Sequence, residues 1–244
     1  MSKVIAITSG KGGTGKSTVC SELGYALACD GKKVILLELD FGLRGLDIML
    51  GNQDKVVYDI GDLLHGECNI NQAVIASGIH PNLYLAAASA SIEREINLDD
   101  IELLCSGLKD YFNYVIADLP AGISLSSLVA PKIADTVLVV TTPDPVCIRD
   151  GNKIVGSLVG YDTSNVRLII NKVDRKLIEQ GMVEDLDEVI DGVGAKLIGV
   201  IPFDYNIQLA AAKGERINKK TLSAKVFYCI AKRLQGEYIP LLVE

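Results

Sequence analysis

The residues with the clearest chemical potential form a glycine-rich octapeptide near the N-terminus. It spans Gly10, Lys11, Gly12, Gly13, Thr14, Gly15, Lys16 and Ser17. The pattern GxxxxGK[ST] follows a β-rich run directly and opens a helical pattern, the setting that a phosphate-binding loop requires. Glycines let successive N–H groups face an anion, and a helix N-terminus adds positive potential. The segment therefore predicts a polyphosphate site, in preference to a glycine-rich turn with a solvated lysine.

The same pattern predicts roles for three side chains. We expect Lys16 to reach the β and γ phosphates, Ser17 to ligate Mg²⁺ through its hydroxyl, and Thr18 to lie at the α phosphate. Tyr114–Asp118 is an apolar run that ends in a carboxylate, the form of an aspartate that holds Mg²⁺ through water. An apolar strand ending in Asp is weak evidence by itself. Its pairing with the phosphate loop makes Asp118 a strong candidate metal ligand.

Apolar runs that could position these residues alternate with stretches of helical spacing. The expected strands are 4–8, 34–39, 83–87, 114–118, 136–141, 166–171 and 197–201, and the expected helices include 17–29, 99–109, 124–133, 150–159 and 183–191. Such alternation predicts an α/β fold: a doubly wound, mostly parallel sheet with helices on both faces. Turns after several strands carry Gly or Asp, at the edge where such sheets bind ligands. We expect one nucleotide-binding domain over residues 1–244.

Composition narrows the protein class. A formal net charge of −7 argues against a protein that coats nucleic acid over its whole surface. The six cysteines include no CxxC pair, which favours free thiols in a reducing compartment. No signal peptide or membrane-spanning run is recognisable, so we expect a cytoplasmic protein. A peripheral location at the inner face of the cell membrane stays open.

Lys11 needs a separate explanation, because an ordinary phosphate loop requires only Lys16. KGGTGKST resembles the deviant Walker A motif of the MinD/ParA family of ATPases. In that family the first lysine reaches across a nucleotide-sandwich dimer to the partner's phosphates. The resemblance thus implies ATP and Mg²⁺ as cofactors, an ATP-dependent homodimer, and catalytic roles for Lys11 and Lys16. A plain surface lysine is the alternative for Lys11.

The segment 36–51, LLELDFGLRGLDIMLG, resembles the switch I segment of the MinD branch of the family. The resemblance implies that Asp40 orients the attacking water and lies near Mg²⁺, although Asp40 could merely cap the next element. Arg44 and Asp47 match the branch pattern. Glu38 stands where the family usually has Asp, which keeps the charge but moves it by one methylene. These residues are expected to form a switch or partner surface.

Two further segments extend this surface. The sequence DLPAG, which ends at Gly122, resembles the family's switch II, where Gly122 would turn its N–H toward the γ phosphate. Arg149 and Asp150 match an RD pair of MinD-like proteins near the dimer and regulator-binding surface. The alternative for that pair is a helix N-terminal Asp beside a surface Arg.

The base-binding side gives conflicting signals. Asn171 fits the family's adenine-reading position, and the segment IGVIPFD, with Pro202 and Asp204, resembles its adenine-side loop. Residues 171–174 also read NKVD, the pattern with which many GTPases recognise guanine, where Asp174 would accept two hydrogen bonds. The deviant Walker A loop favours ATP.

The C-terminal segment bears on membrane and DNA binding. Apolar residues at 222, 226, 229, 230 and 234 fall on one helical face, which favours packing on the sheet over insertion into lipid. Basic residues between Lys213 and Lys225 could contact DNA or anionic lipid, but a solvated face explains them better. We therefore expect neither DNA binding nor a clear membrane-targeting helix.

The motifs together lead us to expect a MinD-type ATPase switch that acts in division-site placement. A regulatory activator protein is expected to control its ATP hydrolysis. The alternatives are a ParA-like DNA-partition ATPase, a flagellar-number regulator and a GTPase. A metal-cluster reductase is disfavoured because Cys105 and Cys147 lie outside glycine-rich loops.

Overall fold

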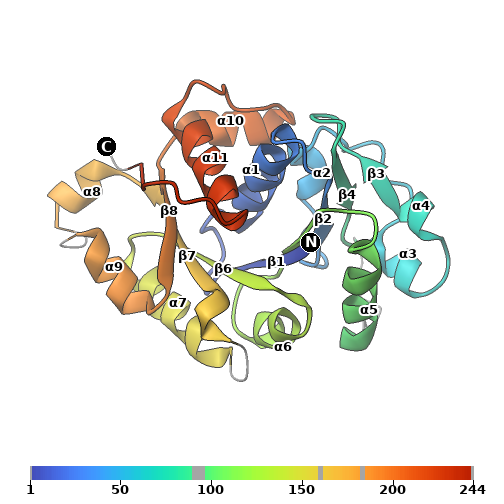
Figure 1. Cartoon of the computed structure of the whole chain (residues 1–244), viewed down its shortest axis with the longest axis horizontal. Coiled ribbons are helices and arrows are strands. Elements are labelled where there is room, and N and C mark those ends of the chain that lie inside the picture. The colour runs from blue at the N-terminus through green and yellow to red at the C-terminus, as the bar shows by residue number, and fades with distance from the viewer. Residues whose placement is uncertain (1, 90–96, 159–161, 182–184, 243–244) are drawn as a thin grey trace.

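A computed structural model of the chain describes residues 2–89, 97–158, 162–181 and 185–242. Within them an eight-stranded sheet runs in the order β3-β4-β2-β5-β1-β6-β7-β8 (Figure 1). Its strands are β1 (Lys3–Thr8), β2 (Val34–Glu38), β3 (Val74–Ala76), β4 (Leu83–Ala86), β5 (Tyr114–Asp118), β6 (Thr136–Thr141), β7 (Val166–Val173) and β8 (Lys196–Pro202). All neighbouring strands pair in parallel except β3, which is antiparallel to β4. The predicted doubly wound, mostly parallel sheet is confirmed.

Helices cover both faces of the sheet (Figure 1). One face carries α1 (Lys16–Cys29), α2 (Leu46–Met49), α10 (Tyr205–Lys213) and α11 (Leu222–Leu234). The other carries α5 (Leu98–Leu108), α6 (Ser124–Ile133), α7 (Pro145–Ser157) and α9 (Leu186–Val193). Shorter helices are α3 (Ile60–Leu64), α4 (Ile70–Ala73), α8 (Arg175–Glu179) and the 3₁₀ turn Thr163–Asn165. None of the helices in the described ranges is long and apolar enough to cross a membrane.

The alternation of side chains along each strand divides the core in two. Ile5 and Ile7 of β1 pack under α1 and α11, whereas Val4 and Ala6 pack on the opposite face. All five residues of β2, VILLE, are buried, as expected for a strand covered on both sides. Burial of each large aliphatic side chain contributes about 1.5–3 kcal/mol, which holds the central strands as a rigid platform for the loops at their carboxyl ends.

The structure differs from the sequence predictions at several elements. β3 and the helices α2, α3, α4 and α8 were not predicted, because segments this short carry too little periodicity. The longer helix α10 was not predicted either. The helix predicted to start at Asp150 begins at Pro145, with the Asp144 side chain accepting hydrogen bonds from Val146 and Cys147 N–H. The predicted helix 183–191 is α9, and its first two predicted positions lie outside the described residues. The apolar face of α11 packs on α1 and β8, as predicted.

Candidate nucleotide-binding site

The phosphate loop connects β1 to α1 at the centre of the sheet. Gly13 and Gly15 have φ angles of 84° and 91°, in the left-handed region that glycine adopts without strain. Gly10 lies directly against the backbone of Asp150 on α7, where a Cβ atom would overlap the Asp150 carbonyl. The loop is therefore shaped by its own glycines and by close packing against α7.

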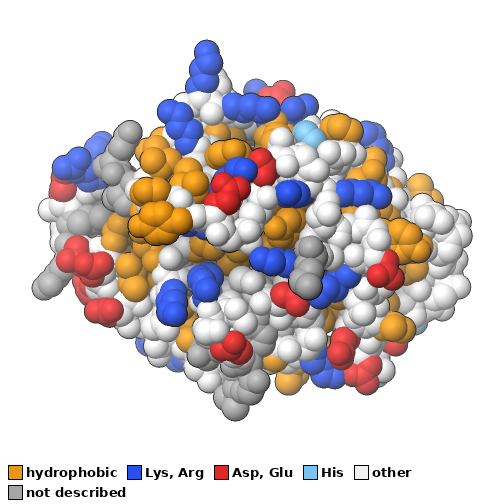
Figure 2. All heavy atoms as spheres, viewed as in Figure 1, with side chains coloured by type: hydrophobic (Ala, Val, Ile, Leu, Met, Phe, Trp, Pro, Cys, Tyr) orange, Lys and Arg blue, Asp and Glu red, His pale blue; other side chains and the backbone are white. Residues whose placement is uncertain are grey.

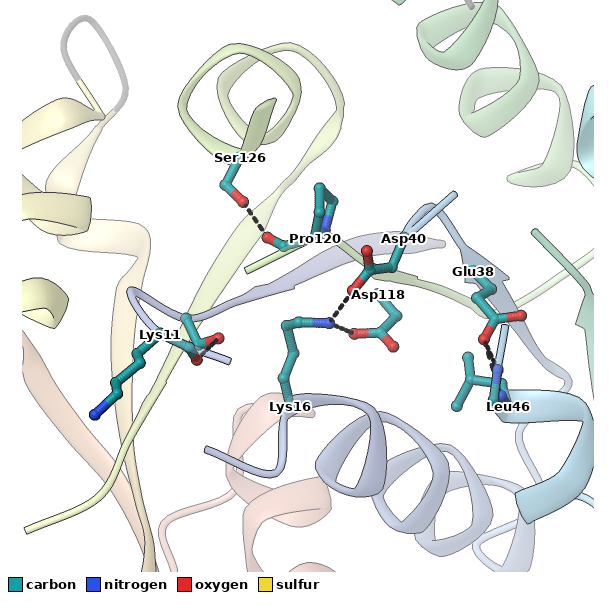
Figure 3. A network of polar contacts seen from close by, with 10 residues as sticks. Lys11, Lys16, Glu38, Asp40, Leu46, Asp118, Pro120 and Ser126 are labelled. Carbon is teal, nitrogen blue, oxygen red and sulfur yellow. Dashed lines mark hydrogen bonds and ion pairs between the residues drawn. The ribbon is translucent and has the colours of Figure 1, made fainter. Parts of the chain in front are cut away.

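Lys16 lies at the first turn of α1 and points toward two carboxylates from neighbouring strand ends (Figure 3). Its Nζ donates a hydrogen bond to Asp118 Oδ1 at 2.7 Å and lies 3.6 Å from Asp40 Oδ2. Both Lys16 and Asp118 are buried, while Asp40 remains partly exposed. The sequence motifs thus meet at one point, where an incoming phosphate would compete with the two carboxylates for the ammonium group.

Asp118 has one oxygen that the described protein groups leave without a partner. Oδ2 is buried and makes no hydrogen bond there, while Oδ1 is held by Lys16. Burial raises the pKa of Asp118, Lys16 and the hydroxyl of Ser17 act to lower it, and Asp40 raises it further. A buried, unpartnered carboxylate oxygen beside a serine hydroxyl is a donor set that suits Mg²⁺. Ser17 and Asp118 therefore fit the metal role predicted for them.

Lys11 occupies the same loop but behaves differently. Its side chain is exposed and extends away from the cluster of Lys16, Asp40 and Asp118 (Figure 3). The Lys11 backbone is held by a hydrogen bond from Ser9 Oγ to its carbonyl, at 3.0 Å. The ammonium group is thus presented outward on a fixed backbone rather than toward this chain's own Lys16 cluster.

A cavity of about 390 Å³ lies beside the loop. It is lined by Lys11, Gly12, Gly13, Thr14, Thr142, Pro143, Asp144, Cys147, Lys172 and Phe203. Phe203 is half exposed, so its ring offers an apolar surface next to the loop. Phe203 and Lys172 were not assigned as site residues, although they lie within the IGVIPFD and NKVD segments that were interpreted as the base-binding side.

Asn171 and Lys172 tie the end of β7 to the phosphate loop. Asn171 Nδ2 donates to the Thr14 carbonyl at 2.7 Å, and Lys172 Nζ donates to the Gly13 carbonyl at 2.7 Å. Lys172 has a φ of 56°, which turns its side chain back across the loop. A Cβ on Gly15 would overlap Asn171 Nδ2. The buried amide nitrogen of Asn171 therefore holds the loop, and base reading by this residue stays a prediction.

Asp204 does not line the cavity. Its Oδ1 accepts the N–H of Asn206 at the start of α10, and its Oδ2 accepts the Ser223 hydroxyl at 2.8 Å. Pro202 ends β8, in register with Val173. Asp204 therefore joins α10 to α11, and its role on the base side stays a prediction.

Two residues of the predicted switch I surface, Glu38 and Asp47, are more buried than a partner surface would be. Glu38 is 1% exposed, and its carboxylate accepts hydrogen bonds from the N–H groups of Gly45, Leu46 and Ala88. Burial raises the pKa of Glu38, and these hydrogen bonds act to lower it. Asp47 is also buried and pairs with Arg44 at 2.7 Å. Glu38 and Asp47 therefore fix the turn into α2 instead of forming the predicted surface.

Gly122 and the RD pair also differ from expectation. Gly122 has the expected positive φ, 94°, but its N–H donates to the Ser9 carbonyl at 2.9 Å rather than facing the phosphate site. The same turn is held by Ser126 Oγ, which donates to the Pro120 carbonyl (Figure 3). Asp150 lies in the middle of α7, so it is not a helix N-terminal residue, and Arg149 beside it is exposed.

Known proteins match the chain over nearly its whole length. The sequence profile described as "CobQ/CobB/MinD/ParA nucleotide binding domain" matches residues 5–217. The septum site-determining protein MinD of Synechocystis is 37% identical over 246 residues, covering 99% of this chain and 92% of that protein. The MinC:MinD cell division protein complex of Aquifex aeolicus superposes with a TM-score of 0.90 at 33% identity, covering 99% of each chain.

A third comparison bears on the ligands. MinD of Pyrococcus horikoshii, solved with Mg-ADP, superposes with a TM-score of 0.84 at 26% identity, covering 96% of each chain. Nucleotide and Mg²⁺ binding thus occur in the group of structures that this chain resembles. The phosphate loop, the sheet order and these matches together show that the chain belongs to the CobQ/CobB/MinD/ParA nucleotide-binding domain family and is a MinD-type ATPase.

Proposed function

We propose that the chain is an ATP-dependent dimerisation switch that acts in division-site placement. One observation carries the proposal: the two lysines of the phosphate loop point to different places. Lys16 is buried against Asp118 and Asp40, whereas Lys11 is exposed and extends outward (Figure 3). A loop that needed only its own lysine would have no use for a second cation held on its rim.

The chemistry within one chain follows from the buried cluster. Lys16 would leave Asp118 to bind the β and γ phosphates, because phosphate oxygens offer it stronger charge-assisted hydrogen bonds. Ser17 and Asp118 would hold Mg²⁺, which neutralises charge on the phosphates. Asp40, the partly exposed carboxylate at the strand end, would orient the attacking water. Thr18 would lie at the α phosphate.

Lys11 would complete the site of a second copy of the chain. Its ammonium group would stabilise charge on the partner's γ phosphate, so hydrolysis would require dimerisation. Analytical ultracentrifugation of wild type and Lys11→Ala, each with ATP, ADP or no nucleotide, tests this. We expect an ATP-dependent dimer for the wild type and loss of both dimer and hydrolysis for the variant.

The matched control is Lys196→Ala. Lys196 is exposed at the amino-terminal end of the edge strand β8, whereas the phosphate loop follows the carboxyl end of the central strand β1. It should dimerise and hydrolyse ATP like the wild type. A wild-type chain that stays monomeric with ATP, or a Lys11→Ala chain with unchanged turnover, would refute the action of Lys11 on a second chain.

The nucleotide is proposed to be ATP rather than GTP. In the NKVD segment, Asn171 and Lys172 hold the phosphate loop, and Asp174 Oδ1 accepts the N–H of Lys176 at 3.0 Å as α8 begins. The three side chains thus have structural partners that do not depend on guanine. Competition between ATP and GTP for a fluorescent nucleotide measures the preference, and tighter binding of GTP would overturn this assignment.

A protein partner and a surface remain to be assigned. Because the Aquifex relative is solved with MinC, we propose that a regulatory protein binds this chain as well.

The apolar residues Val226, Ile230 and Leu234 of α11 are buried against the protein, so α11 is not proposed to insert into lipid. Flotation with anionic liposomes in ATP measures membrane attachment, and flotation of this chain would contradict that expectation.

A further inference from the structure

A second cavity, larger than the one at the phosphate loop, lies between α1 and α11. Its volume is about 560 Å³, within the range of small-molecule sites. One wall is a stripe of α1 at helical spacing, Glu22, Tyr25, Ala26 and Cys29, and the facing wall includes Phe227 and Tyr228 of α11. Figure 2 shows hydrophobic side chains gathered beside α11, with lysine and arginine side chains along the edge by α10.

Glu22 is the feature of this cavity that packing does not explain. The residue is 7% exposed, and its carboxyl oxygens are not among the fully enclosed polar atoms of the described residues, so they open onto the cavity that Glu22 lines. Burial raises the pKa of Glu22 to about 7. Keeping a carboxyl group largely out of water costs free energy unless a charged or hydrogen-bonding partner reaches it, and the cavity is where such a partner could enter.

We propose that this cavity binds a small organic cation, a primary amine on an apolar body, with its ammonium group on the Glu22 carboxylate. The carboxylate supplies the charge partner, and the side chains of Tyr25, Phe227 and Tyr228 supply apolar surface. Arg216 and Lys232 already lie over the Tyr25 and Tyr228 rings, so the carboxylate and not the rings would hold the ligand's ammonium group. An apolar body of this kind would fill the remaining volume.

The other charged groups around the cavity restrict the ligand further. Lys219 and Lys225 contribute to its lining, and both are exposed. They would repel a second positive charge, so the cavity should prefer a monoamine to a polyamine. The remaining titratable groups that line it are Tyr25, Cys29, Tyr228 and Cys229. None of these offers a second carboxylate, so Glu22 alone accounts for the preference for a cation.

Calorimetric titration with three probes of one shape tests the site: 4-phenylbutylamine, 4-phenylbutan-1-ol and 4-phenylbutyrate. We expect the amine to bind roughly tenfold or more tightly than the alcohol, and the acid to bind least. At pH 6, in buffers of different ionisation enthalpy, amine binding should release about one proton per site, because the bound cation ionises Glu22. Spermidine should bind more weakly than the monoamine.

Two variants separate the role of Glu22 from general apolar binding. Glu22→Gln should bind amine and alcohol equally and release no proton, while the matched control Glu215→Gln, at an exposed position, should behave like wild type. Circular dichroism confirms that both variants are folded. Equal affinity of wild type for amine and alcohol, or unchanged amine affinity in Glu22→Gln, would overturn the proposal.

Discussion

Replacing Glu22 with glutamine should change the pH dependence of stability in a defined direction. The pKa of Glu22 rises from 4.5 to about 7 on folding because the side chain is buried. Such a shift corresponds to about 3 kcal/mol, at roughly 1.4 kcal/mol per pKa unit. Between pH 4.5 and about 7, the folded chain keeps the Glu22 carboxyl protonated whereas the unfolded chain ionises it. The contribution of this proton to the free energy of unfolding is therefore complete below pH 4.5 and is lost as the pH rises to about 7.

Glutamine is neutral throughout this range, so the variant does not lose stability as the pH rises, whereas the wild type does. We expect the stability of Glu22→Gln relative to wild type to increase between pH 5 and pH 8 by about 2.5 kcal/mol. Urea unfolding followed by circular dichroism at constant ionic strength measures the difference at each pH.

The control is again Glu215→Gln, whose exposed side chain should give the same difference from wild type at every pH. A stability difference for Glu22→Gln that does not vary with pH would show that the carboxyl group is not desolvated in solution. It would also remove the main support for the amine site between α1 and α11.

Three further substitutions follow from the site geometry. Gly10→Ala should abolish ADP binding, measured by fluorescence titration, because its methyl group would overlap the Asp150 backbone; the control Gly107→Ala, on α5 with nothing within 4 Å of the added atom, should retain it. Glu38→Ala should lower the free energy of urea unfolding by about 3 kcal/mol or more, since three N–H groups lose their acceptor, and a smaller loss would contradict its clamp role. Asp118→Asn should raise the Mg²⁺ concentration needed for half-maximal hydrolysis, and an unchanged Mg²⁺ dependence would contradict its role as ligand.

The fold was readable from sequence to the extent that its elements were long or fully buried. The strands of the central sheet are short apolar runs covered on both faces, so their composition marks them. β3 has only three residues, none of them buried, and it pairs at the sheet edge with β4, so no local pattern could reveal it. The start of α7 was missed because Asp144 and Pro145, a good N-cap and first-turn pair, were interpreted as a loop.

The site was readable only in part. Lys16, Ser17 and Asp118 have roles that follow from the chemistry of phosphate and Mg²⁺, and the structure brings them together as the motifs predict. Asn171 and Asp204 were given base-binding roles because their segments resemble the family's adenine-side positions. Their actual partners, Thr14 and Ser223, lie far away in the sequence, and only the folded chain places them within hydrogen-bonding distance.

What the sequence alone determined is therefore the type of chemistry: a loop whose glycines and lysines can hold polyphosphate, on an α/β sheet. These properties depend on local spacing, which folding does not alter. Only the tertiary structure decided which polar groups are free to act. It used Glu38, Asn171 and Asp204 to hold loops and helices, left Asp118 Oδ2 without a protein partner within the described residues, buried Glu22 beside a cavity, and directed Lys11 outward. Burial and hydrogen bonds between residues distant in sequence determine which side chains hold the structure and which remain free. The spacing of neighbouring residues in the sequence does not reveal either of them.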